Sequence, residues 1–150
     1  MDAKSSYREA AVRGASPVGL VICLYEQAIA DLRGALIALE KNDIEGRTRK
    51  INHALVVIGQ LQGTLDLQRG GQVATSLDRF YNLIRTGLVE AQLKQSATIL
   101  RRQISDLVLL YEAWVEVERA TSAPLPETSR TTQVPPPSGP SAPPFADWNA

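Results

Sequence analysis

Residues of the types that carry out catalysis or bind metals are sparse in this 150-residue chain. His53 is the single histidine, which excludes histidine clusters and any relay through a second imidazole. Cys23 is the single cysteine and lies in an apolar run without a neighbouring cation to activate it, so we interpret it as an inert buried thiol. Acidic pairs such as Asp43 and Glu45 have the spacing of helix caps and solvated helix faces.

The glycine-rich and basic stretches also lack the pattern of a reactive site. Gly70-Gly71 follows an expected helix and precedes no Lys-Ser/Thr pair, which argues against a phosphate-binding loop. Arg47, Arg49 and Lys50 form a basic cluster, but the chain has 16 basic and 16 acidic residues and a net charge of zero. An isolated cluster on a neutral protein is usually a solvated face. We therefore predict no enzymatic activity, no cofactor, no metal site and no nucleic-acid partner.

Composition also limits the compartment and the size of the core. A single cysteine excludes an intramolecular disulfide framework and fits a reducing compartment. No apolar run approaches the roughly 20 residues that a bilayer span needs, and the first residues lack the apolar core of a secretory signal. We expect one domain with a substantial core, located in the cytoplasm (cytosol) without membrane insertion.

Apolar residues recur at steps of three and four in four segments, which predicts an all-α protein. Ser16 and Pro17 suit the cap and the first residue of a long helix. Gly87 lies inside a helical period and indicates that a neighbouring helix approaches closely there. Short connections predict an antiparallel up-down four-helix bundle. The expected helices cover about 17–41, 44–65, 72–94 and 97–117, and Ser96 is expected to cap the last of them. Val73 belongs to the apolar stripe of the third helix, and His53 is expected to be a partly exposed structural residue of the second.

The chain is expected to divide into three parts. Residues 1–15 form a short N-terminal helical segment that caps the bundle, with a frayed terminus as the alternative. Residues 16–120 form the helical bundle. Residues 121–150 contain eight of the nine prolines and are expected to be a disordered tail. Phe145 and Trp148 in this tail form either a short docking motif or no folded element.

The first helix carries more apolar residues than one buried face requires. Leu20, Ile22, Cys23 and Leu24 lie outside its main apolar stripe. A helix that is apolar nearly all round is either central in a bundle or presents a second apolar face to a partner. Both alternatives stay open from the residues alone.

A set of short motifs occurs in a fixed order over residues 7–117. The motifs are Tyr7, Ala15-Ser16-Pro17, Leu24-Tyr25-Glu26, Ala28-Ile29, Leu65-Asp66, Gly70-Gly71, Ala74, Leu77, Tyr81, Leu88, Glu90-Ala91, Leu109-Leu110 and Ala113-Trp114. In their order and spacing they make the chain resemble the FliS family of flagellar export chaperones. Gln92 departs from that pattern, because the family usually has asparagine there.

The resemblance implies a binding function. Members of the family hold the C-terminal segment of flagellin, keep it from polymerising prematurely and present it to the flagellar export gate, a type III secretion system. On the family pattern the segment around Tyr7 covers the groove when cargo is absent. Trp114 is assigned to the core because it is a large aromatic residue in the apolar stripe of the last expected helix. The residues expected to bind cargo are Tyr7, Leu20, Leu24, Tyr25, Leu65, Leu77 and Tyr81. The alternative is a self-associating structural bundle whose extra apolar face is a homo-oligomer interface, such as a weak homodimer.

Overall fold

The structure is a computed structural model that describes residues 16–122. The predicted N-terminal capping segment with Tyr7, and the proline-rich stretch of the tail, fall in 1–15 and 123–150 and lie outside the described residues. The described part consists of helices and short connections, without a strand. The helices are α2 (Pro17–Glu40), α3 (Ile44–Gly63), α4 (Gly71–Lys94) and α5 (Ala97–Ser122).

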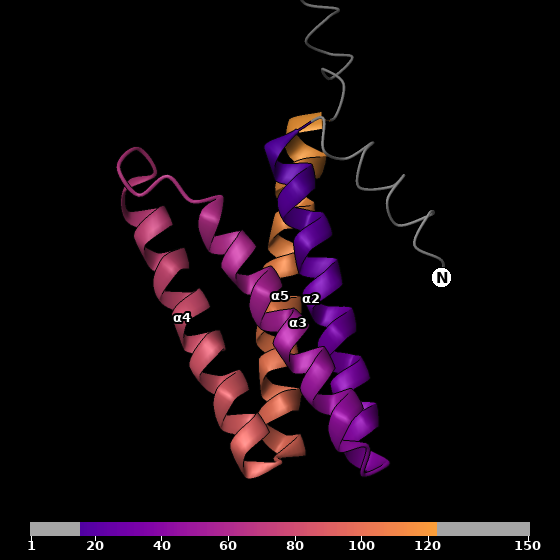
Figure 1. Cartoon of the computed structure of the whole chain (residues 1–150). Helices are drawn as coiled ribbons and strands as arrows, with labels where there is room; N and C mark the ends of the chain where they lie inside the picture. Colours follow the sequence, from indigo (N-terminus) through magenta and orange to yellow (C-terminus); the bar gives the residue numbers. More distant parts are fainter. Residues whose placement is uncertain (1–15, 123–150) are drawn as a thin grey trace, which may run out of the picture. The chain divides into compact units, whose positions relative to one another are not determined.

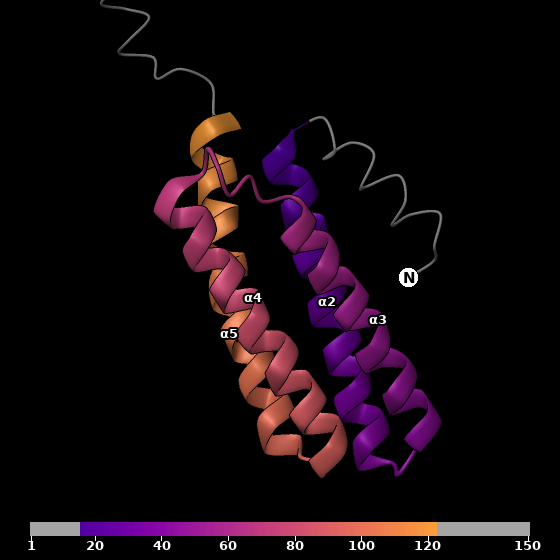
Figure 2. The ribbon, with the colours of Figure 1, turned by 60° about the vertical axis from the view of Figure 1, so that its left-hand side comes forward.

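Successive helices run in opposite directions, which confirms the predicted all-α, antiparallel four-helix bundle. Figure 1 shows α3 in front of α5, with α4 and α2 on either side. In Figure 2 α2 lies beside α3 and α4 lies beside α5. The segment 64–70 joins these two hairpins at one end of the bundle.

Side-chain caps fix where three of the helices begin. Ser16 Oγ accepts a hydrogen bond from the Gly19 N–H at 3.0 Å, with Pro17 as the first helical residue. Asp43 Oδ1 accepts from the Gly46 N–H at 2.9 Å and caps α3. The Ser96 hydroxyl does the same for α5 through the Ile99 N–H. All three caps were predicted, and each is worth about 1 kcal/mol.

The connections use left-handed backbone where the chain must reverse. Gly71 has φ +60°, in agreement with the freedom expected of the paired glycines. Gln95 adopts the left-handed conformation at the C-terminal end of α4, and Asn42 does so between α2 and α3. Asparagine tolerates this region better than most side chains.

The buried core contains residues from all four helices. Gly87 of α4 meets the buried Gln103 of α5, and a Cβ at this glycine would overlap the Gln103 side-chain amide. This confirms the predicted close approach of a neighbouring helix. Trp114 packs against the core but is only half-buried. Large and fully buried members are Ile22, Tyr25, Leu32, Ile51, Ile58, Leu61, Tyr81, Ile84, Leu88, Leu100 and Leu107.

Two tyrosines meet inside this core. The hydroxyl oxygens of Tyr25 on α2 and Tyr81 on α4 lie 2.8 Å apart and share a hydrogen bond. Their ring centroids are 6.2 Å apart in a tilted arrangement. Both side chains are buried, so the hydroxyls depend on partners inside the core: Tyr25 and Tyr81 bond to each other, and the Trp114 side chain also bonds to Tyr25.

This pairing predicts a non-additive effect of removing the hydroxyls. Tyr25→Phe or Tyr81→Phe alone should lower the free energy of unfolding by about 1–3 kcal/mol, because one buried hydroxyl loses its partner. The double variant should cost less than the sum of the two single variants, since the bond between the two hydroxyls is lost only once. Urea unfolding of wild type, the two single variants and the double variant gives the coupling free energy between the two hydroxyls. Additive losses would contradict the coupling.

The same pair predicts a loss of stability at alkaline pH. Burial raises the pKa of Tyr25 above its ordinary value of 10.0, and the nearby Tyr81 raises it further. Burial also raises the pKa of Tyr81. The folded state thus holds these two phenolic protons more tightly than the unfolded chain does. The stabilisation of the folded state by the two tyrosines is therefore present below pH 10 and falls as the pH rises above it. Urea midpoints measured between neutral and alkaline pH should fall more steeply for wild type than for the double phenylalanine variant.

Candidate functional site

The structure separates the predicted binding residues into two groups. Tyr25 and Tyr81 lie in the core and are brought together, so any effect of theirs on a partner is indirect, through the helices they join. Leu24 and Leu65 are half-buried against the core, whereas Leu20 is 43% exposed. Leu77 is half-buried too and lines a surface groove, and Tyr7 lies outside the described residues.

The apolar surplus of the first helix is largely taken up by the bundle. Ile22 is fully buried, and Cys23 is half-buried. The sequence left open whether this helix is central in the bundle or presents a second apolar face to a partner. Its central position accounts for most of these residues. Leu20 is the member of this group that remains on the surface.

Exposed apolar side chains instead gather on α4. Val73, Leu83, Val89 and Leu93 are between 46% and 78% exposed. Val73 was expected in the buried stripe of this helix, but it is 70% exposed. The sequence signal for this surface was the presence of apolar residues at positions 83, 89 and 93, outside the main stripe of the helix.

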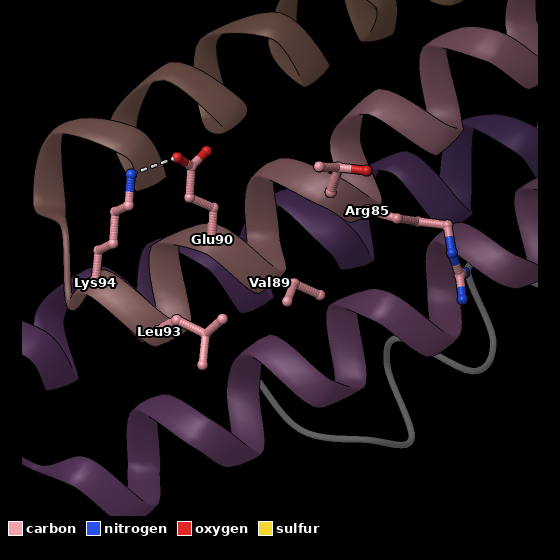
Figure 3. A pocket seen from close by; sticks show the side chains of 6 residues that line it. Arg85, Val89, Glu90, Leu93 and Lys94 are labelled. Carbon is pink, nitrogen blue, oxygen red and sulfur yellow. Dashed lines mark hydrogen bonds and ion pairs between the residues drawn. The ribbon is translucent and has the colours of Figure 1, made fainter.

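One groove runs along the C-terminal half of α4, on the side of this helix that forms hydrogen bonds with α3. It has a volume of about 560 Å³, and Val89 and Leu93 form its apolar surface (Figure 3). At its far end Lys94 forms an ion pair with Glu90 at 2.7 Å. The residues lining it are Arg85, Thr86, Val89, Glu90, Leu93 and Lys94. We call this surface the α3/α4 groove.

Polar contacts rather than close apolar packing join α4 to α3 beside this groove. Arg47 Nε donates to Gln92 Oε1 at 3.0 Å, and Gln92 Nε2 donates to the Thr48 hydroxyl at 2.7 Å. Gln62 bonds to Asp78 and Asn82 of α4 near the other end. The interpretation of Arg47 as part of a solvated basic cluster was wrong, since it is 5% exposed, whereas Arg49 and Lys50 are exposed.

A second groove of about 560 Å³ lies between α4 and α5. It is lined by Gln72, Val73, Ser76, Leu77, Phe80 and Leu110. A smaller one of about 290 Å³ lies between α2 and α5, where the Tyr111 hydroxyl donates to Glu26 at 2.9 Å. The first two grooves are largely apolar, which suits a partner with apolar side chains.

The described residues contain no cluster of three or more metal-binding side chains. His53 is half-exposed and its Nδ1 lies 2.5 Å from Asp31 Oδ2, a contact that joins α3 to α2. This is the structural role predicted for the histidine. None of the helices in the described part combines the length and the hydropathy that a bilayer crossing requires.

Comparison with known proteins agrees with this picture of a bundle that binds rather than reacts. Residues 1–121 match the family described as Flagellar protein FliS. The chain is 30% identical over 115 residues to the flagellar secretion chaperone FliS of Salmonella typhimurium, covering 76% of this chain and 85% of the relative. It is 32% identical over 106 residues to the flagellar secretion chaperone FliSB of Pseudomonas aeruginosa, covering 71% and 84%. A Campylobacter jejuni FliS is 31% identical over 102 residues, or 68% and 80%.

These matches define the class of protein as a helical-bundle chaperone of flagellar secretion and not an enzyme. The chain belongs to the FliS family. The sequence resemblance and the expected absence of enzymatic activity are therefore confirmed.

The bridge between α3 and α4 yields a stability prediction. Gln92→Ala should lower the free energy of unfolding by about 1–3 kcal/mol, because the buried Arg47 loses its hydrogen-bond acceptor. Gln60→Ala, at an exposed position of α3, is the matched control and should change it by less than about 0.5 kcal/mol. Chemical denaturation followed by circular dichroism measures both. Equal effects of the two substitutions would contradict a role for the bridge.

Proposed function

We propose that this chain is a cytosolic export chaperone that binds the C-terminal segment of flagellin on the apolar surface of α4. Bound in this way, flagellin is kept from polymerising before export and is delivered to the export gate of the flagellum. The observation that carries the proposal is the open apolar side of the α3/α4 groove, in a chain of the flagellar secretion chaperone family. Val89 and Leu93 form this surface and are 46% and 78% exposed.

The chemistry of the surface suits a segment that folds as it binds. An amphipathic helix laid in an apolar groove buries its own apolar face, which is the face that would otherwise contact other flagellin molecules. Ordering the segment costs conformational entropy, so a large apolar contact is needed to offset that cost. The two grooves that flank α4 offer such a contact on either side of one helix.

Self-association is the competing use of the same surface. Exposed valine and leucine side chains on α4 would also pair two copies of the chain, as in a homodimer. A chaperone should instead form a defined one-to-one complex with its cargo, with no need for a second copy. Binding and oligomeric state are therefore measured together.

Calorimetric titration of the full chain with a C-terminal flagellin peptide from the same organism tests the proposal. We expect one-to-one binding with a dissociation constant of about 1 μM or below and a negative heat-capacity change, because apolar surface is buried. Leu93→Asp should weaken binding by about tenfold or more, since a buried leucine contributes about 1.5–3 kcal/mol. Leu83→Asp is the matched control, because Leu83 is also exposed on α4 but lines none of the described grooves.

The outcomes separate the two uses of the surface. An absence of heat and of a complex on a sizing column would reject the chaperone proposal for flagellin. A concentration-dependent dimer that Leu93→Asp dissociates, with no peptide binding, would favour self-association. Equal losses from Leu93→Asp and Leu83→Asp would show that the peptide does not use the α3/α4 groove.

A further inference from the structure

Arg85 stands out among the residues of the α3/α4 groove. It leaves α4 one turn before Val89 and is half-buried. Figure 3 shows its side chain extending along the groove toward the neighbouring ribbon. Its Nη1 donates to the Leu55 carbonyl of α3 at 3.4 Å, a long hydrogen bond. A Cβ on Gly59 would lie 3.5 Å from the same nitrogen, so the missing side chain there leaves room beside the guanidinium.

The guanidinium has no acidic partner within the described residues. Ion pairs in this part of the chain join His53 to Asp31, Arg69 to Asp66, Lys94 to Glu90 and Arg101 to Glu40. Arg85 takes part in none of these, and Glu90, on the next turn of α4, is occupied by Lys94. A guanidinium carries five N–H donors in a planar fork that matches a carboxylate, and one weak neutral acceptor leaves most of them unused.

We propose that Arg85 pairs with a carboxylate of the cargo segment and fixes the register of that segment along the groove. The inference rests on the proposed function, because it names the chemistry of the ligand at the same site. Charge complementarity is the argument: a positive group without an internal counter-charge lies at one end of an apolar surface whose other cation is already neutralised. A bidentate pair with a carboxylate adds geometric specificity that apolar contacts lack.

The spacing along α4 defines what the cargo helix must carry. Arg85, Val89 and Leu93 are four residues apart, so they share one side of the helix over about 12 Å. The matching cargo is an amphipathic helix whose apolar side chains cover Val89 and Leu93. An aspartate or glutamate must lie one to two turns from those side chains, at the end that faces Arg85.

Two substitutions in the full chain isolate this contact. Arg85→Gln and Arg79→Gln each remove one positive charge from α4, but Arg79 is exposed and lines none of the described grooves. Titration with the C-terminal flagellin peptide should show binding about tenfold to hundredfold weaker for Arg85→Gln, the range for loss of a charge-assisted hydrogen bond. Arg79→Gln should stay within about twofold of wild type. Melting curves check that both variants fold.

Peptide variants supply a second measurement that needs no change in the protein. Replacing each peptide aspartate or glutamate by its amide, one at a time, should identify one carboxylate whose loss matches that of Arg85→Gln. Combining that peptide with Arg85→Gln should cause no further loss, whereas the combination with Arg79→Gln should be additive. Additive losses with Arg85→Gln, or no sensitive carboxylate at all, would overturn the pairing.

The failure of this inference is distinguishable from the failure of the proposed function. If wild type binds the peptide, Leu93→Asp weakens binding and Arg85→Gln behaves like Arg79→Gln, then the groove binds cargo without the pairing. If the peptide does not bind wild type, both the cargo and its pairing with Arg85 are rejected.

Discussion

The hydrogen bond between Tyr25 and Tyr81 is the contact around which the bundle is arranged. It joins α2 to α4, two helices that are not consecutive in the chain, inside a largely apolar core. Polar groups in such a place are costly unless they are paired, so the two hydroxyls favour one rotation of α4 relative to α2. With Tyr81 directed inward, the apolar residues at other positions around α4 are left on its flanks.

The rotation of α4 leaves Val89 and Leu93 on its surface, outside the core. Arg47, Thr48 and Gln92 bridge α3 and α4 through side chains, and the groove beside this bridge is lined by residues of α4, among them Val89 and Leu93. Gln92 is also the position at which the sequence departs from the asparagine of the family pattern. The longer amide side chain reaches both Arg47 and Thr48 across this interface.

Much of the fold could be predicted from local sequence, because local rules decide it. Ser16, Asp43 and Ser96 cap helices through contacts three residues away, and Gly87 marks a close approach because any larger residue would have to displace a neighbour. The site was less predictable. The Tyr25 hydroxyl finds its partner 56 residues further along the chain, and helical periodicity does not reveal which polar atom a neighbouring helix supplies. For the same reason Arg47 was taken for a surface residue and Val73 for a core residue.

A chaperone of this class needs a rigid scaffold and an open surface that holds its ligand. The buried and the exposed sides of α4 meet these two requirements separately. The scaffold has to be rigid enough to hold an apolar surface open in water, and the buried side of α4 meets that requirement through Tyr81, Ile84 and Leu88. The ligand has to be held without a deep pocket, so recognition depends on a long, shallow contact. In the proposed complex, apolar contacts along α4 would provide affinity but tolerate sliding by a turn, because valine and leucine accept many neighbours. A cation with directional donors at one end removes that freedom, since only one register brings a carboxylate to it. Arg85 lies where such a constraint is most effective, one turn beyond the apolar surface and beside the small residue Gly59.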